Sequence, residues 1–145
     1  MKQNKFPEID LNGESILITG GTGSFGKALV NNVLENYTPS RLIVFSRDEF
    51  KQSQMTQELG ISNVMDESKY PFLRFFIGDV RDSDRLEMAM HGVDNVIHAA
   101  ALKQVLSAEY NPFEYAHTNI NGAENIVKAS LRSGAKRVIA LSTDK

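Results

Sequence analysis

Short apolar runs alternate along the chain with longer stretches in which apolar residues recur every three or four positions. The runs are rich in β-branched or aromatic residues, which is typical of buried parallel strands. They occupy residues 16–18, 42–45, 73–77, 93–98 and 138–141. The recurrence between them is the pattern of amphipathic helices that turn one face to the core. The pattern therefore predicts five strands separated by helices.

Two of the predicted helices carry long apolar stripes. One stripe consists of Leu29, Val30, Val33, Leu34 and Tyr37, and the other of Phe113, Ala116, Ile120, Ala123, Val127 and Leu131. Pro112 suits the first turn of the second helix, because proline has no N–H to leave unsatisfied there. Gly134 suits the position just past its end, where the backbone often turns left-handed.

Two further helices and a loop complete the pattern. One helix is expected over about residues 48–59, and another runs to Met90 from Asp82, whose side chain can cap it. Residues 60–72 carry mixed charge and a proline, which favours a surface loop.

This alternation of strands and helices predicts an α/β fold, a Rossmann-like, doubly wound parallel sheet. Right-handed crossovers give the strand order 3-2-1-4-5. In such a sheet, ligands bind beyond the carboxyl ends of the strands. The segments expected at that edge are the turn after the first strand and residues 46–51, 78–81, 99–103 and 142–145.

A glycine-rich turn, Thr19-Gly20-Gly21-Thr22-Gly23-Ser24-Phe25-Gly26, follows the first predicted strand. Glycine at positions 20, 23 and 26 permits a tight turn, a close approach of backbone to phosphate, and close packing of the next helix. That helix start offers free N–H groups and the positive end of its dipole. We expect the dinucleotide pyrophosphate to bind Gly20, Thr22, Gly23, Ser24, Phe25 and Gly26. The competing interpretation is an ordinary glycine-rich loop.

The end of the second predicted strand bears on which dinucleotide binds. NAD sites usually place a carboxylate there for the ribose 2′-hydroxyl, whereas a 2′-phosphate needs positive charge and small donors. Here Ser46, Arg47 and, one helical turn on, Lys51 can converge on a phosphate. The sequence therefore favours NADP. The alternative is that Arg47 and Lys51 only pair with the neighbouring Asp48 and Glu49 on a solvated face.

The ends of the third and fourth strands supply further candidate contacts. The Asp79 carboxylate can accept from the exocyclic amine of adenine while the Val80 backbone meets a ring nitrogen; the alternative for Asp79 is a helix-start aspartate. The run Ala99-Ala100-Ala101 offers small side chains where a cofactor crosses the sheet. Lys103 is expected near the nicotinamide or the sugar, or else is a surface lysine.

Composition limits the classes of partner. The 16 basic and 18 acidic side chains give a net charge of −2, so no overall field attracts nucleic acid or an anionic membrane. The chain has no cysteine, and its three histidines are scattered, so no metal site is predicted. No targeting or membrane-spanning segment is evident, and a cytoplasmic protein is expected.

Taken together, the motifs resemble those of the extended short-chain dehydrogenase/reductases. They are the glycine turn, Ser46-Arg47-Asp48-Glu49, Gly78-Asp79-Val80-Arg81-Asp82, His98-Ala99-Ala100-Ala101-Leu102-Lys103 and Leu141-Ser142-Thr143-Asp144-Lys145. Within that group the chain looks most like the inverting UDP-N-acetylglucosamine 4,6-dehydratases of polysaccharide biosynthesis, which make capsule and flagellin sugars. The similarity runs from about Asn12 to the last residue.

The resemblance implies a reaction. NADP⁺ takes a hydride from C4 of the sugar, water is lost across C5 and C6, and the hydride returns to C6. By resemblance, Asp144 is the acid that protonates the departing 6-hydroxyl and Lys145 is the base at C5. Thr143 holds the C4 region by a hydrogen bond. A lysine can act as a base only if burial or a neighbouring cation lowers its pKa.

The resemblance also indicates what lies outside these 145 residues. The Tyr-x-x-x-Lys motif, the sixth strand and the substrate domain of the group are expected beyond Lys145, so residues 1–145 are interpreted as an N-terminal NADP-binding fragment. Such a fragment is expected to bind NADP weakly and to leave a nucleotide sugar unchanged. Relatives assemble as dimers or larger rings, so a homo-oligomer is expected. The alternatives are a nucleotide-sugar 4-epimerase and a non-catalytic NADP-binding module.

Overall fold

The computed structural model describes residues 9–61 and 69–142. Its strands are β1 (Ser15–Thr19), β2 (Arg41–Ser46), β3 (Leu73–Ile77), β4 (Asn95–His98) and β5 (Arg137–Ala140). Its helices are α1 (Ser24–Asn36), α2 (Glu49–Glu58), α3 (Ser83–Met90), α4 (Val105–Tyr110), α5 (Pro112–Ala116), the π-helical η1 (His117–Asn121) and α6 (Gly122–Ser133). Helix and strand alternate as the sequence predicts.

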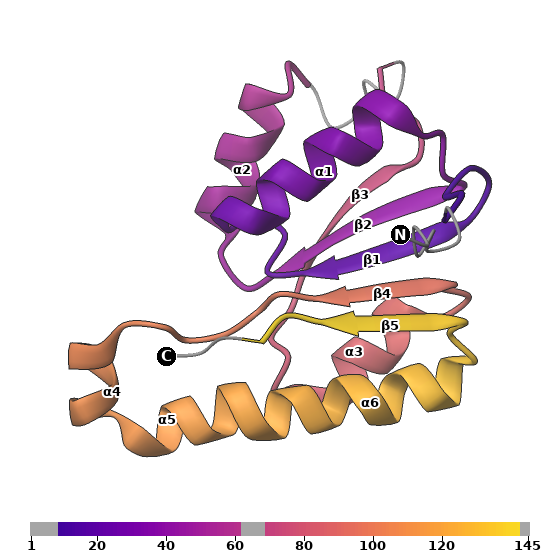
Figure 1. Cartoon of the computed structure of the whole chain (residues 1–145). Helices are drawn as coiled ribbons and strands as arrows, with labels where there is room; N and C mark the ends of the chain where they lie inside the picture. The colour runs from indigo at the N-terminus through magenta and orange to yellow at the C-terminus, as the bar shows by residue number, and fades with distance from the viewer. Residues whose placement is uncertain (1–8, 62–68, 143–145) are drawn as a thin grey trace, which may run out of the picture.

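The strands form one parallel sheet in the order β3-β2-β1-β4-β5, which confirms the predicted fold class and strand order. Helices α1 and α2 cover one face of the sheet, and α3 and α6 cover the other (Figure 1). Alternate residues of β1 serve the two layers: Ile16 and Ile18 pack on the side of α1, and Leu17 packs on the side of α3. Because both faces are covered, the central strands are continuous apolar runs.

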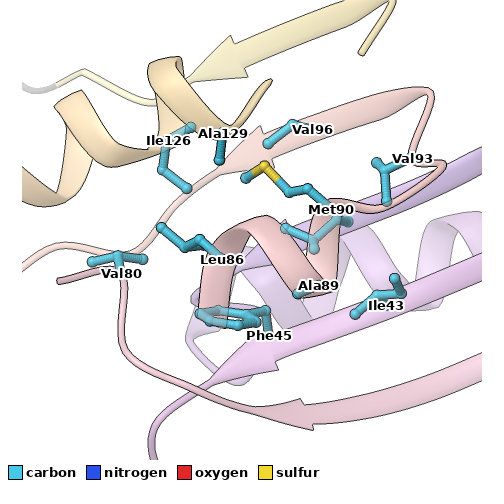
Figure 2. Packing of buried hydrophobic residues seen from close by; sticks show 11 residues of the cluster. Ile43, Phe45, Val80, Leu86, Ala89, Met90, Val93, Val96, Ile126 and Ala129 are labelled. Atoms are coloured by element: carbon cyan, nitrogen blue, oxygen red, sulfur yellow. The ribbon is translucent and has the colours of Figure 1, made fainter. Parts of the chain in front are cut away.

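The packing between α3 and α6 also fixes a loop at the carboxyl edge of the sheet. Figure 2 shows Leu86 and Met90 of α3 facing Ile126 of α6, with Val80 of the loop after β3 at one end of the cluster. A Cβ on Gly122 would lie 2.7 Å from Cγ2 of Val80, so only glycine allows α6 to approach this closely. The loop after β3 is therefore held against the helix layer.

The helix ends agree with the sequence signals. Asp82 caps α3 by accepting a hydrogen bond from the backbone N–H of Arg85 at 2.9 Å, as predicted. Asp48 caps α2 in the same way. Pro112 is the first residue of α5, and Gly134, with φ of 71°, follows the end of α6. Local capping chemistry thus sets where these helices begin and end.

One predicted strand begins at a later residue, another, β5, is exposed instead of buried, and one helix was not predicted. Strand β4 begins at Asn95 and not at residue 93, because Gly92 (φ 66°) turns the chain and the Val93 amide bonds back to the Met90 carbonyl at 3.0 Å. The six-residue helix α4 was not predicted. It buries no residue, so it has no apolar stripe facing a core.

The second predicted apolar stripe lies on the outer face of its helix and not, as predicted, on the face that meets the core. Helix formation from Pro112 to Ser133 is confirmed, but Phe113, Ile120, Val127 and Leu131 are 53–79% exposed. The face of α6 that meets the core carries Gly122, Ile126, Ala129 and Ser130 instead. Small residues occupy that face because α6 packs closely on Val80 and α3. The stripe is therefore an outer apolar surface, which we call the outer helical face.

The predicted loop over 60–72 agrees with the structure where it is described. Residues 60–61 and 69–72 form neither helix nor strand, and residues 62–68 lie outside the described residues. Within residues 9–61 and 69–142, none of the helices has the length and apolar character needed to cross a bilayer.

Candidate functional site

A cleft of about 720 Å³ opens at the carboxyl edge of the sheet. All the residues that the sequence predicted for cofactor binding line it: Gly20, Thr22, Gly23, Ser24, Phe25, Gly26, Ser46, Arg47, Lys51, Asp79, Val80, Ala99, Ala100, Ala101 and Lys103. They come from the carboxyl ends of β1, β2, β3 and β4 and from the segments that follow them, including the first turns of α1 and α2. The topology thus brings four separate segments together, and their roles remain predictions.

The glycine turn packs so closely on neighbouring backbone that it leaves no room for a side chain at Gly20 or Gly26. Gly20 has φ of 66°, and a Cβ there would lie 2.8 Å from the amide nitrogen of Ala100. A Cβ on Gly26 would lie 2.5 Å from the Gly20 carbonyl oxygen. Helix α1 then begins at Ser24, and its N-cap residue, Gly23, has no side chain to cap it. Its first-turn amides are therefore available to an anion.

The end of β2 carries a serine, two cations and a carboxylate. The backbone N–H of Lys51 donates to Oδ1 of Asp48 at 3.0 Å, and the Lys51 ammonium lies 3.9 Å from Oδ2. The alternative pairing of Lys51 with Asp48 is thus present as a loose contact. Arg47 instead faces Asp79 across the cleft, with Nη1 3.8 Å from Oδ2. Ser46 is 8% exposed, and its hydroxyl accepts from Gln52 at 2.9 Å.

Asp79 anchors the loop after β3. Its carboxylate accepts from the backbone N–H of Arg81 at 2.9 Å and from the Arg81 guanidinium at 2.8 Å. Burial raises the pKa of Asp79, but the hydrogen bonds from Arg81 and the charges of Arg81 and Arg47 outweigh it, so the pKa lies below its ordinary value. The helix-start role that competed for Asp79 belongs to Asp82 instead. Asp79 is therefore an ionised acceptor at the cleft.

Thr19 and His98 join β1 to β4 beneath the cleft. The Thr19 hydroxyl oxygen accepts from the amides of Ala99 and Ala100 at 3.2 and 3.3 Å, and it lies 2.8 Å from Nδ1 of His98. Burial lowers the pKa of His98. The contact gives the ring of this strand-end histidine a hydrogen-bond partner within the fold. It also holds the backbone of the alanine run at the cleft floor.

Sequence reasoning missed several residues that line the cleft, among them Gln104, Ser107, Tyr115 and Thr118. Tyr115 donates its hydroxyl hydrogen to the Gln104 carbonyl at 2.6 Å. Asn119 of η1 accepts from the Leu102 amide at 2.9 Å and donates to the Leu102 carbonyl at 3.0 Å. These contacts tie α5 and η1 to the loop after β4, and spacing alone gave no signal for them.

Thr118 is the most informative of the missed residues. It is 5% exposed, and its hydroxyl has no hydrogen-bond partner, alone in this among the buried side-chain polar atoms of residues 9–61 and 69–142. It also lines the cleft. A buried polar group without a partner costs free energy unless a ligand or water completes it. Its signal in the sequence was a polar residue inside a helix, which is too common to single out.

The predicted catalytic residues Thr143, Asp144 and Lys145 lie outside the described residues. Strand β5 leads toward them and ends at Ala140, beside His98 of β4. The described ranges contain no group of three histidine, aspartate or glutamate side chains arranged to hold a metal ion.

The cleft fits a dinucleotide by three observations. Gly20 and Gly26 have no room for a side chain because neighbouring backbone lies too close, and both glycines line the cleft. Helix α1 presents its N-terminus there. The buried Thr118 hydroxyl has no hydrogen-bond partner in the described residues, and Thr118 lines the same cleft.

The sequence of the chain also matches a known protein family. A family model, the polysaccharide biosynthesis protein family, matches residues 16–145. The chain belongs to this family. It is 55% identical over 134 residues to an inverting UDP-N-acetylglucosamine 4,6-dehydratase of Campylobacter jejuni, with 92% of this chain and 37% of the relative covered. It is 44% identical over 135 residues to a UDP-glucose 4-epimerase of Rickettsia canadensis, with 91% and 37% covered.

A solved structure agrees with these relatives. The dTDP-glucose 4,6-dehydratase DesIV of Streptomyces venezuelae, a double mutant solved with NAD bound, matches with a TM-score of 0.74 and 25% identity. The match covers 88% of this chain and 39% of DesIV. The chain thus spans less than two fifths of the length of these proteins. The resemblance to extended short-chain dehydrogenase/reductases that act on nucleotide sugars is confirmed.

Proposed function

We propose that the chain is the NADP-binding part of an inverting UDP-N-acetylglucosamine 4,6-dehydratase. The observation that carries the proposal is the cleft, which gathers the glycine turn, the end of β2 and the alanine run in a chain 55% identical to such an enzyme. The reaction would make the protein a lyase in the cytoplasmic synthesis of a surface polysaccharide or flagellin sugar.

The end of β2 supports NADP over NAD. The Asp48 carboxylate, the nearest acid after that strand, is committed to the cap of α2 and to Lys51. Arg47 lies at the cleft with half of its side chain exposed, and Lys51 is also exposed there. Two cations beside a serine hydroxyl suit a 2′-phosphate, whereas the 2′-hydroxyl of NAD calls for a free carboxylate.

Each segment of the cleft would bind one part of the cofactor. Backbone amides from Gly20 to Gly26 would hold the diphosphate, and Asp79 and Val80 would meet the adenine. When bound, NADP⁺ supplies a hydride acceptor for the sugar. Lys103, on the loop that Asn119 holds, would lie near the nicotinamide or the sugar. Thr118 would donate or accept one hydrogen bond on the floor of the cleft.

The residues after β5 would perform the proton transfers. Asp144 would protonate the departing 6-hydroxyl, Lys145 would remove the C5 proton, and Thr143 would orient the C4 region. Strand β5 supports this because it directs the chain to the cleft edge. Lys145 can act as a base at neutral pH only with its pKa lowered by burial or a nearby cation.

A UDP-glucose 4-epimerase is the second candidate, because the 44% identical Rickettsia canadensis relative carries that activity. The Asp144-Lys145 pair favours dehydration, since an epimerase removes no water and needs no acid for a leaving hydroxyl. A non-catalytic NADP-binding module is the third reading, and it would bind the cofactor without any turnover.

We also propose that the protein self-associates through the outer helical face. Phe113, Ile120, Val127 and Leu131 recur at spacings of seven and four residues and are 53–79% exposed. Together with Tyr110, which is 80% exposed, they offer on the order of 600 Å² of apolar surface, approaching the ~800 Å² that each partner gives to a stable interface. Large apolar patches of this kind mark contact sites.

Mass spectrometry of the reaction product tests the proposal. The protein that contains this chain together with its substrate domain is incubated with UDP-N-acetylglucosamine. A 4,6-dehydratase gives a product lighter by one water, an epimerase gives an isomer of unchanged mass that chromatography separates from the substrate, and a binding module leaves the substrate as it was. The 145-residue chain alone is expected to bind NADP and leave the sugar unchanged, so dehydration by it would contradict the fragment interpretation.

A further inference from the structure

Gln52 is a buried amide directly behind the proposed 2′-phosphate site. It lies on α2 and is 6% exposed. Its Nε2 atom faces three oxygens: Oγ of Ser46 at 2.9 Å, the carbonyl of Phe76 at 3.0 Å and the carbonyl of Ser46 at 3.2 Å. The motifs gave Gln52 no role, yet its amide makes three contacts directly behind Ser46, which lines the cleft.

The chemistry of these partners fixes the direction of every hydrogen bond. Carbonyl oxygens only accept, so the amide nitrogen of Gln52, and not its oxygen, must face the Phe76 and Ser46 carbonyls. The Ser46 hydroxyl therefore meets a nitrogen that carries two hydrogens. In that contact the hydroxyl oxygen can only accept.

The consequence falls on the hydroxyl hydrogen of Ser46. Since Oγ accepts from Gln52, its own hydrogen must point elsewhere, and the hydroxyl donates no hydrogen bond to another group within residues 9–61 and 69–142. Ser46 lines the cleft between the glycine turn and Arg47. The hydroxyl thus presents a donor to the cleft.

We infer that Gln52 is a positioning residue that fixes the Ser46 hydroxyl as a donor to the 2′-phosphate, and so favours NADP over NAD. This inference rests on the cofactor proposed above. A phosphate has only acceptor oxygens in its dianionic form, so a fixed donor suits it. The ribose 2′-hydroxyl of NAD can donate or accept, and it gains less from a neighbour that can only donate.

Gln52 also joins α2 to β2 and β3, and these contacts would be enough to give it a purely structural role. The two roles differ in what they predict. A structural role lowers stability and weakens both cofactors together. A positioning role changes the ratio of the two affinities, because only NADP carries the phosphate.

The test compares dissociation constants for NADP⁺ and NAD⁺, measured by titration calorimetry on the chain and five variants. Gln52→Met removes the amide with little change of volume, and Gln54→Met is the matched control on the exposed side of the same helix. Ser46→Ala removes the donor, and the double variant Ser46→Ala/Gln52→Met tests whether both act through one contact. Thermal unfolding of each variant is measured in parallel.

We expect Ser46→Ala to weaken NADP⁺ binding about tenfold, Gln52→Met about fivefold, and Gln54→Met not at all. NAD⁺ binding should change less than about twofold in each. In the Ser46→Ala background, Gln52→Met should add nothing. Gln52→Asn, whose amide is one methylene too short for Ser46, should weaken NADP⁺ binding like Gln52→Met.

Each failure has its own signature. If the unmodified chain does not prefer NADP⁺, the cofactor proposal is wrong and this inference is overturned with it. If it prefers NADP⁺ but Gln52→Met weakens both cofactors equally, only the inference is overturned. If neither Gln52 variant folds, Ser46→Ala decides alone, because an unchanged NADP⁺ to NAD⁺ ratio would remove the donor on which the inference depends.

Discussion

The Thr19 hydroxyl donates a hydrogen bond to Nδ1 of His98 over 2.8 Å, across the ends of two neighbouring strands. The direction follows from the other contacts of the hydroxyl, because its oxygen already accepts from the amides of Ala99 and Ala100. Nδ1 of His98 must then be unprotonated. A single side chain thereby links β1, β4 and the backbone at the cleft floor, and the link requires a neutral imidazole.

Stability is therefore predicted to fall when His98 would have to take up a proton. Burial holds its pKa below the ordinary 6.5, so the unfolded chain binds this proton more tightly than the folded chain. The contribution is fully present above about pH 6.5 and is lost as the pH falls toward the lowered pKa. Urea unfolding between pH 5 and pH 7.5 measures the effect as a drop in the free energy of unfolding.

His98→Asn is the control for that pH dependence. The asparagine carbonyl can accept from Thr19 but does not titrate, so the variant should lose the decline between pH 6.5 and pH 5. Carboxylates such as Asp79 and Asp94 have pKa values below their ordinary 3.8, so their effects belong to lower pH. An equal decline in the variant would assign the slope to other groups.

Gly20→Ala should greatly lower the free energy of unfolding, whereas Gly13→Ala should lower it only slightly. Both glycines have positive φ, 66° and 71°, so alanine costs about 1 kcal/mol of backbone strain at each. Only at Gly20 would the new Cβ meet backbone, 2.8 Å from the Ala100 nitrogen, while nothing lies within 4 Å at Gly13. We expect a loss of about 3 kcal/mol or more in the free energy of unfolding for Gly20→Ala.

Urea unfolding of the two glycine variants measures this difference, and NADP⁺ titration follows its effect on the cleft. Equal losses of unfolding free energy in both variants would mean that the close approach of Gly20 to the loop after β4 does not add to the cost of a side chain there. Comparing the two positions separates backbone conformation, which they share, from packing, which they do not.

Thr118→Val should stabilise the chain and weaken cofactor binding. Valine keeps the volume of threonine and removes a buried hydroxyl that has no partner in the described residues, so the free energy of unfolding should rise by about 1 kcal/mol. Binding should weaken about fivefold if the hydroxyl bonds the cofactor. Thermal unfolding and NADP⁺ titration are the measurements, and Thr118→Ser, which keeps the hydroxyl, should bind normally. If Thr118→Val binds NADP⁺ as tightly as the original chain, the Thr118 hydroxyl makes no hydrogen bond to the cofactor.

The sequence predicted the central strands well because β1, β2 and β4 are buried on both faces. Continuous apolar runs such as Ile16 to Ile18 admit few other structures once glycine and helical stripes separate them. The glycine turn was predictable for a similar reason, since the backbone conformation at Gly20 excludes other residues. Features set by local chemistry, including the Asp82 cap, were also within reach of sequence reasoning.

Features set by partners from distant segments were not predictable. Periodicity marked Val127 and Leu131 as core, yet α6 lies so close to Val80 that small residues face inward and these two face outward. Likewise, nothing in the sequence around Gln52 reveals that its amide reaches the Phe76 carbonyl of the next strand. Such contacts depend on the register of β2 and β3 and on the placement of α2, which exist only in the folded chain.

Replacing Val127 and Leu131 by glutamate should abolish self-association without unfolding the chain. Both side chains are more than half exposed, so the substitutions leave the core intact but put charge into the proposed contact. Sedimentation velocity over a range of concentrations should give a larger species for the original chain and a monomer for the variant. Phe50→Glu is the matched control, since Phe50 is 70% exposed on α2, across the sheet from α6. If Phe50→Glu disrupts association and the paired variant does not, the contact lies on the α2 side instead. A chain that is monomeric at every concentration would contradict the proposal of self-association.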